Sequence, residues 1–333
     1  MNKYLKKIMS GGNLNDTETS EIIEAIISGD LNEVLAGAIF TALAMKGETV
    51  EELLGIVETM RKHMVEIKTD GVILDTCGTG GDGAHTINIS TIVAFACASV
   101  GVQVAKHGNR SVSSKCGSFD VLEELGVNIE MDTVTAQKCL EEVGITCLFA
   151  PKYHPAMKHI AQVRTQLGVR TAFNFIGPLL NPAHATHQLI GVSNEKMAQK
   201  LGEIAMKLGL QKVILVHSDD GLDEISISAP TYIYEFVAGQ DMKAYRIEPE
   251  QFFSLEDIVG GDRVQNAKIM KEILSGRGTL AQNMCIAMNA GMALYTVGKV
   301  VNFEEGKTLA YEILKSGIGM KKLEECIAFG SHI

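Results

Sequence analysis

Two segments of this chain, each of which follows an apolar run, carry residue types that bind oxyanions. Residues 78–83 read Gly-Thr-Gly-Gly-Asp-Gly and follow residues 72–74, while residues 106–110 read Lys-His-Gly-Asn-Arg and follow residues 102–105. Glycine lets backbone N–H groups approach an oxyanion without a Cβ in the way, and Lys106 adds a mobile positive charge. One glycine-rich loop alone is also typical of an ordinary turn. Two such loops after two predicted strands favour a single phosphate-binding site.

The residues that follow the first loop predict the start of a helix. Residues 88–91, Asn-Ile-Ser-Thr, open an apolar stretch at 92–96. The unpaired N–H groups and the positive dipole end of such a helix suit a phosphate. The glycine loop lacks the Lys-Ser/Thr ending of a P-loop and the spacing of a dinucleotide-binding motif. An ordinary ATPase or dehydrogenase is therefore disfavoured.

Four carboxylates follow another predicted strand at 213–216: Asp219, Asp220, Asp223 and Glu224. Carboxylates at the carboxyl end of a strand are well placed to face a ligand crevice. Their hard oxygen atoms are also the ligands that Mg²⁺ prefers beside substrate phosphates. An acidic loop is, however, more often solvated surface, so the residues alone leave both interpretations open.

The composition indicates a globular protein in which any anion-binding surface is local. The chain has 333 residues, 46% of them hydrophobic, and can bury the core of one or two domains. Its net charge of −10 disfavours a general nucleic-acid binder, which usually shows a basic surface. Seven cysteines without a Cys-x-x-Cys pair indicate reduced thiols, and there is neither a secretory core nor a long apolar run. These features predict a cytoplasmic protein outside the membrane.

The apolar spacing predicts helices first and an α/β arrangement afterwards. Three pairs in the first 65 residues resemble helix-capping pairs and indicate a small helical domain: Asn15 with Glu18, Asp30 with Glu33, and Thr49 with Glu52. From about residue 70, short apolar runs alternate with helical stretches, as in a mainly parallel α/β sheet. The expected strands are 72–74, 102–105, 145–149, 188–192 and 213–216, followed by a hairpin of 231–237 and 242–247.

Taken together, these segments resemble the anthranilate phosphoribosyltransferase family. The matching segments are 78–82, 88–91, 106–114, 150–157, 170–182 and 219–226, and the resemblance extends over essentially the whole chain. It implies an α/β fold of the nucleoside phosphorylase/phosphoribosyltransferase class, with a small N-terminal helical domain and a large α/β domain with a mainly parallel central sheet. The helical domain is expected at 1–67, joined by part of 165–185. The α/β domain, which binds the phosphoribosyl donor and the metal, is expected at 68–333.

The resemblance also implies a reaction. The family transfers the 5-phosphoribosyl group of 5-phospho-α-D-ribosyl 1-pyrophosphate (PRPP) to the amino group of anthranilate, giving N-(5-phosphoribosyl)anthranilate and pyrophosphate in tryptophan biosynthesis. Mg²⁺ is the expected cofactor, with two ions accompanying the donor. A homodimer through the helical domain is expected, and neither nucleic acid nor a membrane is an expected partner.

Residue by residue, the resemblance implies catalytic roles for Lys106, His107 and Arg164, and metal binding by Ser90, Asp223 and Glu224. The implied donor-binding residues are Gly78, Gly81, Asp82, Thr86, Asn88, Ile89, Ser90, Thr91, Lys106, His107, Gly108, Asn109, Arg110, Ser111, Val112, Ser113, Ser114 and Ser118. The implied anthranilate-binding residues are Gly78, His107, Asn109, Ala150, Pro151, His154, Met157, Arg164, Gly177 and Pro178. Arg164 offers the two-pronged geometry that a carboxylate requires. No general base is expected, because the arylamine is already neutral at pH 7.

Four positions depart from the family pattern: Phe119 replaces a small alanine, Gln162 a proline, Thr165 a basic residue and Ser218 a glycine. Two other functions fit related architectures. A pyrimidine nucleoside phosphorylase shares the helical-plus-α/β fold, but Gly108-Asn109-Arg110 stands where that family has Ser-Thr-Gly-Gly. A nucleic-acid-binding relative without catalysis conflicts with the acidic net charge.

Overall fold

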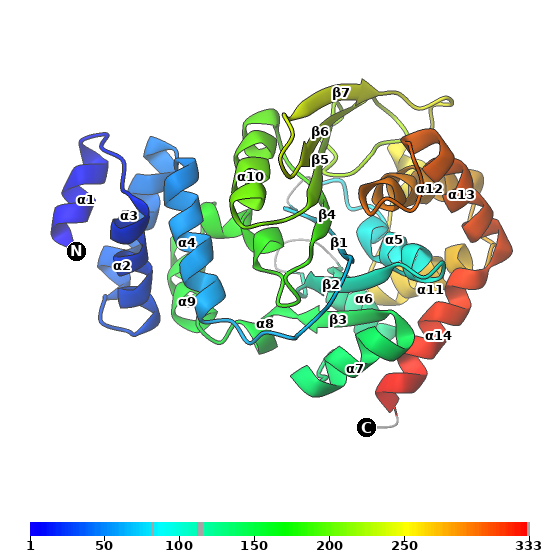
Figure 1. The fold of residues 1–333 in the computed structure, drawn as a ribbon, viewed down its shortest axis with the longest axis horizontal. Helices are drawn as coiled ribbons and strands as arrows, with labels where there is room; N and C mark the ends of the chain where they lie inside the picture. The colour runs from blue at the N-terminus through cyan, green and yellow to red at the C-terminus, as the bar shows by residue number, and fades with distance from the viewer. Residues whose placement is uncertain (81–82, 112–115, 332–333) are drawn as a thin grey trace.

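The computed structural model describes residues 1–80, 83–111 and 116–331. The chain begins with four helices that pack as a bundle beside a larger α/β unit (Figure 1). These helices are α1 (Asn2–Met9), α2 (Asp16–Ile27), α3 (Glu33–Lys46) and α4 (Val50–Lys62). The described parts of the chain contain no helix that is both long and apolar enough to cross a membrane.

The helix starts follow the capping chemistry of the sequence, with one exception. Asn15 with Glu18 and Thr49 with Glu52 form reciprocal capping boxes, as predicted. The predicted pairing of Asp30 with Glu33 is wrong, because the N-cap of α3 is Asn32, whose side chain accepts from Leu35 N–H. An Asn at this position lies directly before the first helical turn and captures one of its free N–H groups.

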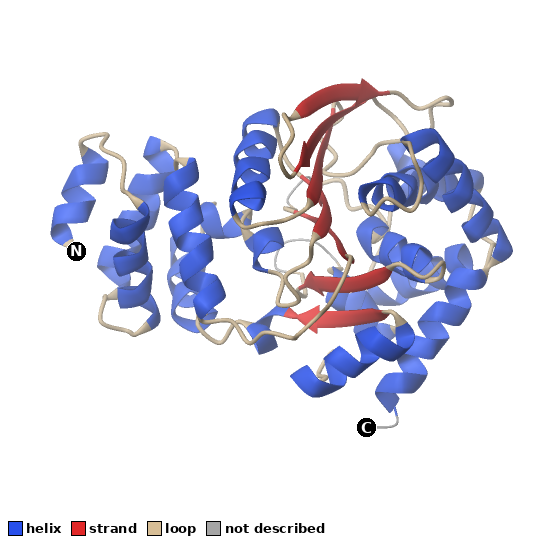
Figure 2. Ribbon diagram, viewed as in Figure 1, coloured by secondary structure: helices blue, strands red, loops and turns tan. Residues whose placement is uncertain are grey.

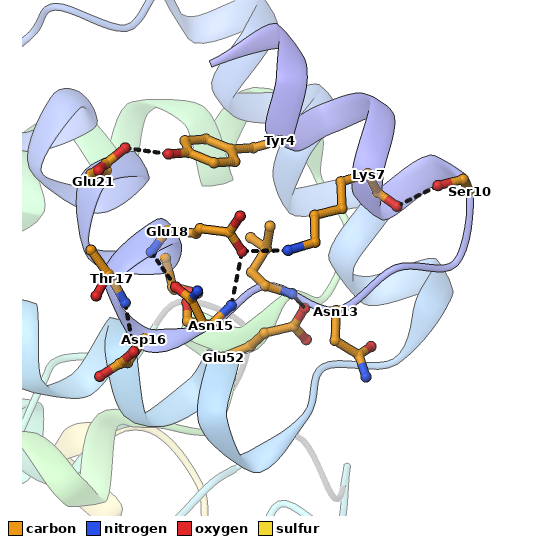
Figure 3. Close-up of polar contacts among 12 residues, drawn as sticks. Tyr4, Lys7, Ser10, Asn13, Asn15, Asp16, Thr17, Glu18, Glu21 and Glu52 are labelled. Atoms are coloured by element: carbon orange, nitrogen blue, oxygen red, sulfur yellow. Dashed lines mark hydrogen bonds and ion pairs between the residues drawn. The ribbon is translucent and has the colours of Figure 1, made fainter.

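Polar contacts attach α1 to its neighbours in the bundle (Figure 3). Lys7 Nζ on α1 lies 2.6 Å from Glu18 Oε2 on α2, and the Tyr4 hydroxyl bonds to Glu21. Glu52 on α4 lies close to the same region and is completely buried. The short first helix is therefore held by side chains as well as by its apolar face.

The α/β unit contains a seven-stranded sheet in the order β3-β2-β1-β4-β5-β6-β7. Its strands are β1 (Ile73–Gly78), β2 (Gln103–Gly108), β3 (Ile145–Phe149), β4 (His187–Gly191), β5 (Lys212–Ser218), β6 (Thr231–Val237) and β7 (Lys243–Ile247). Strands β1 to β5 pair in parallel, whereas β6 and β7 form the predicted antiparallel hairpin. The predicted fold class, a helical domain plus an α/β domain with a mainly parallel sheet, is confirmed.

Helices cover both faces of this sheet (Figure 2). On the bundle side, α10 (Glu195–Lys207) packs on β5 and β6, while α5 (Ile89–Ala98) and α12 (Leu280–Thr296) pack on the opposite face. The remaining helices of that side are α6 (Ser118–Glu124), α7 (Thr133–Val143), α11 (Arg263–Leu274), α13 (Phe303–Ser316) and α14 (Ile318–Ser331), with the 3₁₀ turn η3 (Leu255–Ile258). Cover on both faces explains why the parallel strands are buried along most of their length.

Between β3 and β4 the chain returns to the helical bundle. This segment contains α8 (Ala150–Tyr153), α9 (Met157–Leu167), η1 (Ala172–Asn174) and η2 (Gly177–Leu180). Helix α9 packs on α2 and α3, and η2 contacts α4, where Arg61 Nε donates to Leu179 O at 2.8 Å. One hydrophobic core consequently runs from the bundle through this segment to α10. The division into 1–67 with part of 165–185, and 68–333, stays a prediction.

Glu52→Ala should strongly destabilise the bundle. The carboxylate accepts from Leu14 N (2.9 Å), Thr49 N (2.8 Å) and Lys46 Nζ (2.8 Å), and its removal takes away the side-chain acceptor of both backbone N–H groups and the ionic partner of Lys46. We expect the free energy of unfolding, measured by urea denaturation, to fall by about 3 kcal/mol. Lys321→Ala, which removes an exposed ion pair, is the control and should cost less than about 0.5 kcal/mol. Equal losses would contradict this account of Glu52.

Candidate active site

The carboxyl ends of β1, β2 and β4 open onto two adjoining cavities. This edge is the point where the strand order reverses, with β2 on one side of β1 and β4 on the other, and ligands bind at such switch points in open α/β sheets. One cavity, of about 410 Å³, is lined mainly by polar groups and is called the polar cavity. The other, of about 700 Å³, is lined mainly by apolar groups and is called the apolar cavity. Residues that line both are Cys77, Gly78, Thr79, His107, Gly108 and Asn109.

The polar cavity gathers most of the predicted donor and metal residues. Its lining includes Gly78, Thr86, Asn88, Ile89, Ser90, Thr91, Lys106, His107, Gly108, Asn109, Arg110, Ser118, Asp223 and Glu224. The predicted residues Gly81, Asp82, Val112, Ser113 and Ser114 lie outside the described residues, and Ser111 is described but does not line the cavity. Prediction from the sequence missed eight further described residues that also line it: Cys77, Thr79, Gly80, His85, Ile87, Cys116, Gly261 and Asn266.

Lys106 is a fixed charge rather than the mobile one expected from the sequence. It lies within β2, not in a loop, and is only 1% exposed. Its Nζ donates to Thr76 O at 2.8 Å and to Ser90 Oγ at 3.3 Å, which ties β1, β2 and the start of α5 together. Nearby, the buried hydroxyl of Thr91 has no hydrogen-bond partner among the described residues. This hydroxyl is suited to donate to an oxygen of a bound anion.

Asp75 is a buried carboxylate that the sequence prediction did not single out. It is 0% exposed and accepts from His107 N and from Gln188 Nε2, each at 3.4 Å. Burial raises the pKa of Asp75, while the charge of Lys106 opposes that shift. An acid directly after the apolar run 72–74 was the available signal, and buried carboxylates are rare unless they are paired. We infer that Asp75 balances part of the Lys106 charge beneath the cavity.

The acidic loop lies across the ends of β1 and β4 because both strands end in glycine. Gly78 and Gly191 are register partners. A Cβ on Gly78 would lie 2.5 Å from Asp223 Oδ2, and a Cβ on Gly191 would overlap the Asp223 backbone. Gly80 N–H then donates to Asp223 Oδ2 at 2.7 Å. Asp223 is therefore placed by backbone packing and not by its own rotamer alone.

The oxygen donors of this loop fit Mg²⁺. Asp223 and Glu224 line the polar cavity together with the hydroxyl-bearing Ser90, whereas Asp219 and Asp220 lie outside its described lining. Mg²⁺ typically takes one or two protein carboxylates and fills its other positions with water and substrate phosphates. The described residues accordingly contain no cluster of three or more His, Cys, Asp or Glu side chains suited to a metal. Two carboxylates facing a phosphate-sized cavity match that preference.

Ser218, which replaces the family's usual glycine, supports the same loop. It is completely buried, and its hydroxyl donates to Glu224 O at 2.7 Å and pairs with Thr231 Oγ1 at 2.6 Å. Phe119, the other unusual buried residue, stacks on Phe149 with ring centroids 5.4 Å apart. Gln162 and Thr165 are exposed on α9, so these two departures leave the cavity walls unchanged.

The apolar cavity gathers every predicted anthranilate residue. Its lining includes Gly78, His107, Asn109, Ala150, Pro151, His154, Met157, Arg164, Gly177 and Pro178. The sequence prediction missed several further residues of the wall formed by the segment from α8 to η2: Pro155, Lys158, Ala161, Phe173, Asn174, Ile176 and Leu180. Their proximity depends on the return of this segment to the bundle, which no local pattern predicts.

Arg164 is the one arginine in the described lining of this cavity. It is partly buried, and burial lowers the pKa of its guanidinium. Among the described residues no carboxylate forms an ion pair with it. A guanidinium in an apolar wall without an internal counter-ion favours a ligand that brings its own carboxylate.

Two histidines meet in the wall shared with β2. His107 Nε2 lies 3.1 Å from His154 Nε2, and both side chains are buried. Burial, together with repulsion from Lys106 and from His154 in its protonated form, lowers the pKa of His107 well below its usual value, and burial lowers the pKa of His154 to about 4. Both rings are therefore neutral at pH 7, and one Nε2 donates its hydrogen to the other.

Family models match most of the chain. One described as the helical bundle domain of a glycosyl transferase family matches residues 2–64, and one described as the a/b domain of a glycosyl transferase family matches residues 70–320. The fold and the paired cavities thus define a glycosyl transferase with a helical bundle domain and an α/β domain.

Individual proteins and structures that are similar to this chain belong to one family. The chain is 46% identical to the anthranilate phosphoribosyltransferase of Desulfosudis oleivorans over 330 residues, covering 98% of this chain and 97% of that protein. It is similar to the crystal structure of the enzyme from Thermus thermophilus, with a TM-score of 0.92, 36% identity and coverage of 98% and 99%. It is also similar to the Saccharomyces cerevisiae enzyme in complex with PRPP and Mg, with a TM-score of 0.91, 27% identity and coverage of 99% and 98%. The chain belongs to the anthranilate phosphoribosyltransferase family.

His154→Gln should weaken the loss of stability in acid. The folded-state pKa of about 4 is below the ordinary value of 6.5, so the unfolded chain takes up a proton first as the pH falls. Stability is thus retained above pH 6.5 and lost between pH 6.5 and 4. Relative to pH 7.5, wild type should lose about 2 kcal/mol more than His154→Gln at pH 5, measured by urea unfolding at both pH values. Parallel losses in the two proteins would refute the neutral buried imidazole.

Proposed function

We propose that this chain transfers the 5-phosphoribosyl group of PRPP to the amino group of anthranilate, releasing pyrophosphate, as a step of tryptophan biosynthesis. The observation that carries the proposal is the position of Arg164 in an apolar cavity that joins a polar, carboxylate-lined one. The polar cavity suits the phosphorylated donor. The apolar cavity suits an aromatic ring, and Arg164 suits its carboxylate.

The proposed donor site combines neutral hydrogen-bond donors with a buried cation. Ser90 and Thr91 begin α5, where backbone N–H groups and the helix dipole favour an anion. Lys106 is held behind Ser90 and adds positive charge without blocking the cavity. These groups bind the pyrophosphate and stabilise the charge that develops on it as its bond to C1 of the ribose breaks.

Asp223 and Glu224 are the proposed Mg²⁺ ligands, with Ser90 contributing its hydroxyl and with two ions expected beside the donor. When bound, Mg²⁺ neutralises negative charge on the leaving pyrophosphate and orients it. The chain's own contribution is to fix these oxygen atoms: Gly80 N–H holds the Asp223 carboxylate, and Ser218 holds the Glu224 backbone. This support keeps the carboxylates on the cavity side of the loop.

The two substrates meet at the residues common to both cavities. Arg164 binds the carboxylate of anthranilate, and the ring lies between apolar groups such as Pro178 and Met157. The amino group then faces C1 of the ribose near His107 and Asn109, and its neutral lone pair forms the N–C1 bond while the C1–O bond to pyrophosphate breaks. The nitrogen afterwards loses its extra proton to the released pyrophosphate or to water. Because this lone pair is available without prior deprotonation, His107 acts by positioning and by local electrostatics.

We also propose a homodimer through the helical domain and a cytoplasmic location. A groove between α1, α3 and α9 is lined by apolar side chains, among them Met9 and Met45, which are 73% and 84% exposed. An exposed apolar surface that can pack against the same surface of a second copy is typical of a two-fold dimer interface. The free thiols of the six cysteines other than Cys116 agree with a reducing compartment.

Arg164→Ala should remove recognition of the substrate carboxylate. We expect the KM for anthranilate to rise about 30-fold with little change in kcat, since the charge-assisted bonds form in the ground state and the transition state alike. Aniline, which lacks the carboxylate, is the matched control substrate, and its kcat/KM should be almost unchanged by the substitution. Steady-state kinetics with both acceptors measure this preference. If the variant still preferred anthranilate as strongly as wild type does, Arg164 would not bind the carboxylate.

Asp223→Asn combined with Glu224→Gln should raise the Mg²⁺ requirement. The substitutions keep the approximate shape but remove the anionic ligands, so the Mg²⁺ concentration for half-maximal activity should rise at least about tenfold. Asp219→Asn is the control, because Asp219 is exposed in the same loop and lies outside the described cavity lining. Activity titrations and thermal melts distinguish metal loss from unfolding. A normal Mg²⁺ requirement in the double variant would exclude these ligands.

A further inference from the structure

A short chain of hydrogen bonds leads from the backbone of Gly261 to Asn88 in the polar cavity. Gly261 N–H donates to Asn266 Oδ1 at 2.7 Å, and Asn266 Nδ2 donates to Asn88 Oδ1 at 2.9 Å. Asn266 lies on α11, is 3% exposed, and lines the polar cavity together with Gly261. The site residues predicted from the sequence include Asn88 but neither Gly261 nor Asn266.

The direction of these hydrogen bonds is determined by the first donor, Gly261 N–H. A backbone N–H can only donate, so the Asn266 atom that faces Gly261 is its carbonyl oxygen, and its NH₂ group faces Asn88. Asn88 must therefore turn its oxygen toward Asn266. Its NH₂ group is left on the other side, where it donates to Cys116 O at 3.4 Å, and both Asn88 and Cys116 line the polar cavity.

The backbone around these hydrogen bonds is equally constrained. Ile87 N–H donates to Ile258 O and Gly260 N–H donates to His85 O, each at 2.9 Å, so the segment that enters α5 is attached to the segment that precedes α11. A Cβ on Gly260 would lie 2.6 Å from Asn266 Oδ1, which shows how closely the two segments pack. Within the described stretch 83–111, Asn88 occupies the N-cap of α5 without capping it through its side chain. Its amide is committed to Asn266 instead.

We propose that Asn266 is a positioning residue for the phosphoribosyl donor: it holds the Asn88 amide with its NH₂ group toward the polar cavity. This inference rests on the function proposed above. PRPP presents oxygen atoms, most of them anionic, and an N–H donor attracts such atoms whereas an amide oxygen repels them. Asn266 thereby sets the polarity of one wall of the donor site through another side chain.

Asn266→Asp tests this polarity with almost no change in shape. A carboxylate oxygen facing Asn88 accepts only, so the Asn88 amide must reverse and turn its own oxygen toward the donor. We expect the KM for PRPP to rise at least about tenfold, with the KM for anthranilate changed less than about twofold. Asn266→Ala, which deletes more atoms but imposes no reversal, should raise the KM for PRPP less, by about threefold. A role in packing alone predicts the opposite order of the two variants.

The Asn88→Ala background distinguishes an effect that acts through the Asn88 amide, here called the relay, from direct repulsion of PRPP by the new carboxylate. If Asn266 acts through Asn88, then Asn266→Asp should raise the KM for PRPP no further when Asn88 is already alanine. A full effect in that background would mean that the carboxylate repels PRPP directly, and the relay would be rejected. Should Asn266→Asp fail to fold, Asn266→Ala enters the same cycle, and its effect on the KM for PRPP must likewise vanish in Asn88→Ala.

Asn283→Asp is the matched control for placing an acid at a buried asparagine. Asn283 on α12 is 8% exposed, donates Nδ2 to Gly278 O at 3.0 Å, and lies outside the described lining of the polar cavity. This control should lower Tm and leave the KM for PRPP unchanged. The proposed function fails if wild type makes no phosphoribosylanthranilate. The role of Asn266 fails if wild type is active and a folded Asn266→Asp variant retains the wild-type KM for PRPP.

Discussion

The alternation of side chains along β2 is the constraint on which the rest of the site depends. Successive residues of a strand point to opposite faces of a sheet. Lys106 therefore reaches Ser90 at the start of α5 on one side, while the next residue, His107, reaches His154 on the other. These two consecutive residues place the positive charge of Lys106 on one face of the strand and the neutral ring of His107 on the other. This arrangement lets one strand end serve two chemically different cavities.

The glycines that end β1 and β4 determine where the acidic loop lies. Because neither Gly78 nor Gly191 carries a Cβ, the backbone of the loop that contains Asp223 lies directly on the sheet edge. The carboxylates of Asp223 and Glu224 thus line the same cavity as the first turn of α5, which we propose binds the phosphates of the donor. Pre-organisation of this kind matters for group transfer, since oriented charges need no rearrangement when the leaving group departs.

The sequence predicted those features that are local or that depend on recognisable motifs. The capping boxes at Asn15 and Thr49 follow from residues three positions apart, and the two cavities gather residues from the motifs at 78–91 and 106–110. Long-range partners could not be predicted in the same way. Asn266 lies 178 residues from Asn88, and nothing in an ordinary amphipathic helix indicates that its amide turns toward a distant ligand site. Asn32 replaced Asp30 as a cap because two good capping residues compete within one short turn.

The segment between α9 and η2 belongs structurally to the seam between the bundle and the sheet. It forms one wall of the apolar cavity and shares the hydrophobic core of the bundle, and the adjoining η2 is held at Leu179 by Arg61 of α4. The polar cavity draws its described lining from the α/β unit alone. With the two cavities assigned as in the proposed function, the scaffold separates the groups that bind the phosphoribosyl donor from the wall that selects its acceptor. Substitutions accumulating along this seam can change the accepted aromatic molecule over evolutionary time while the donor chemistry stays intact.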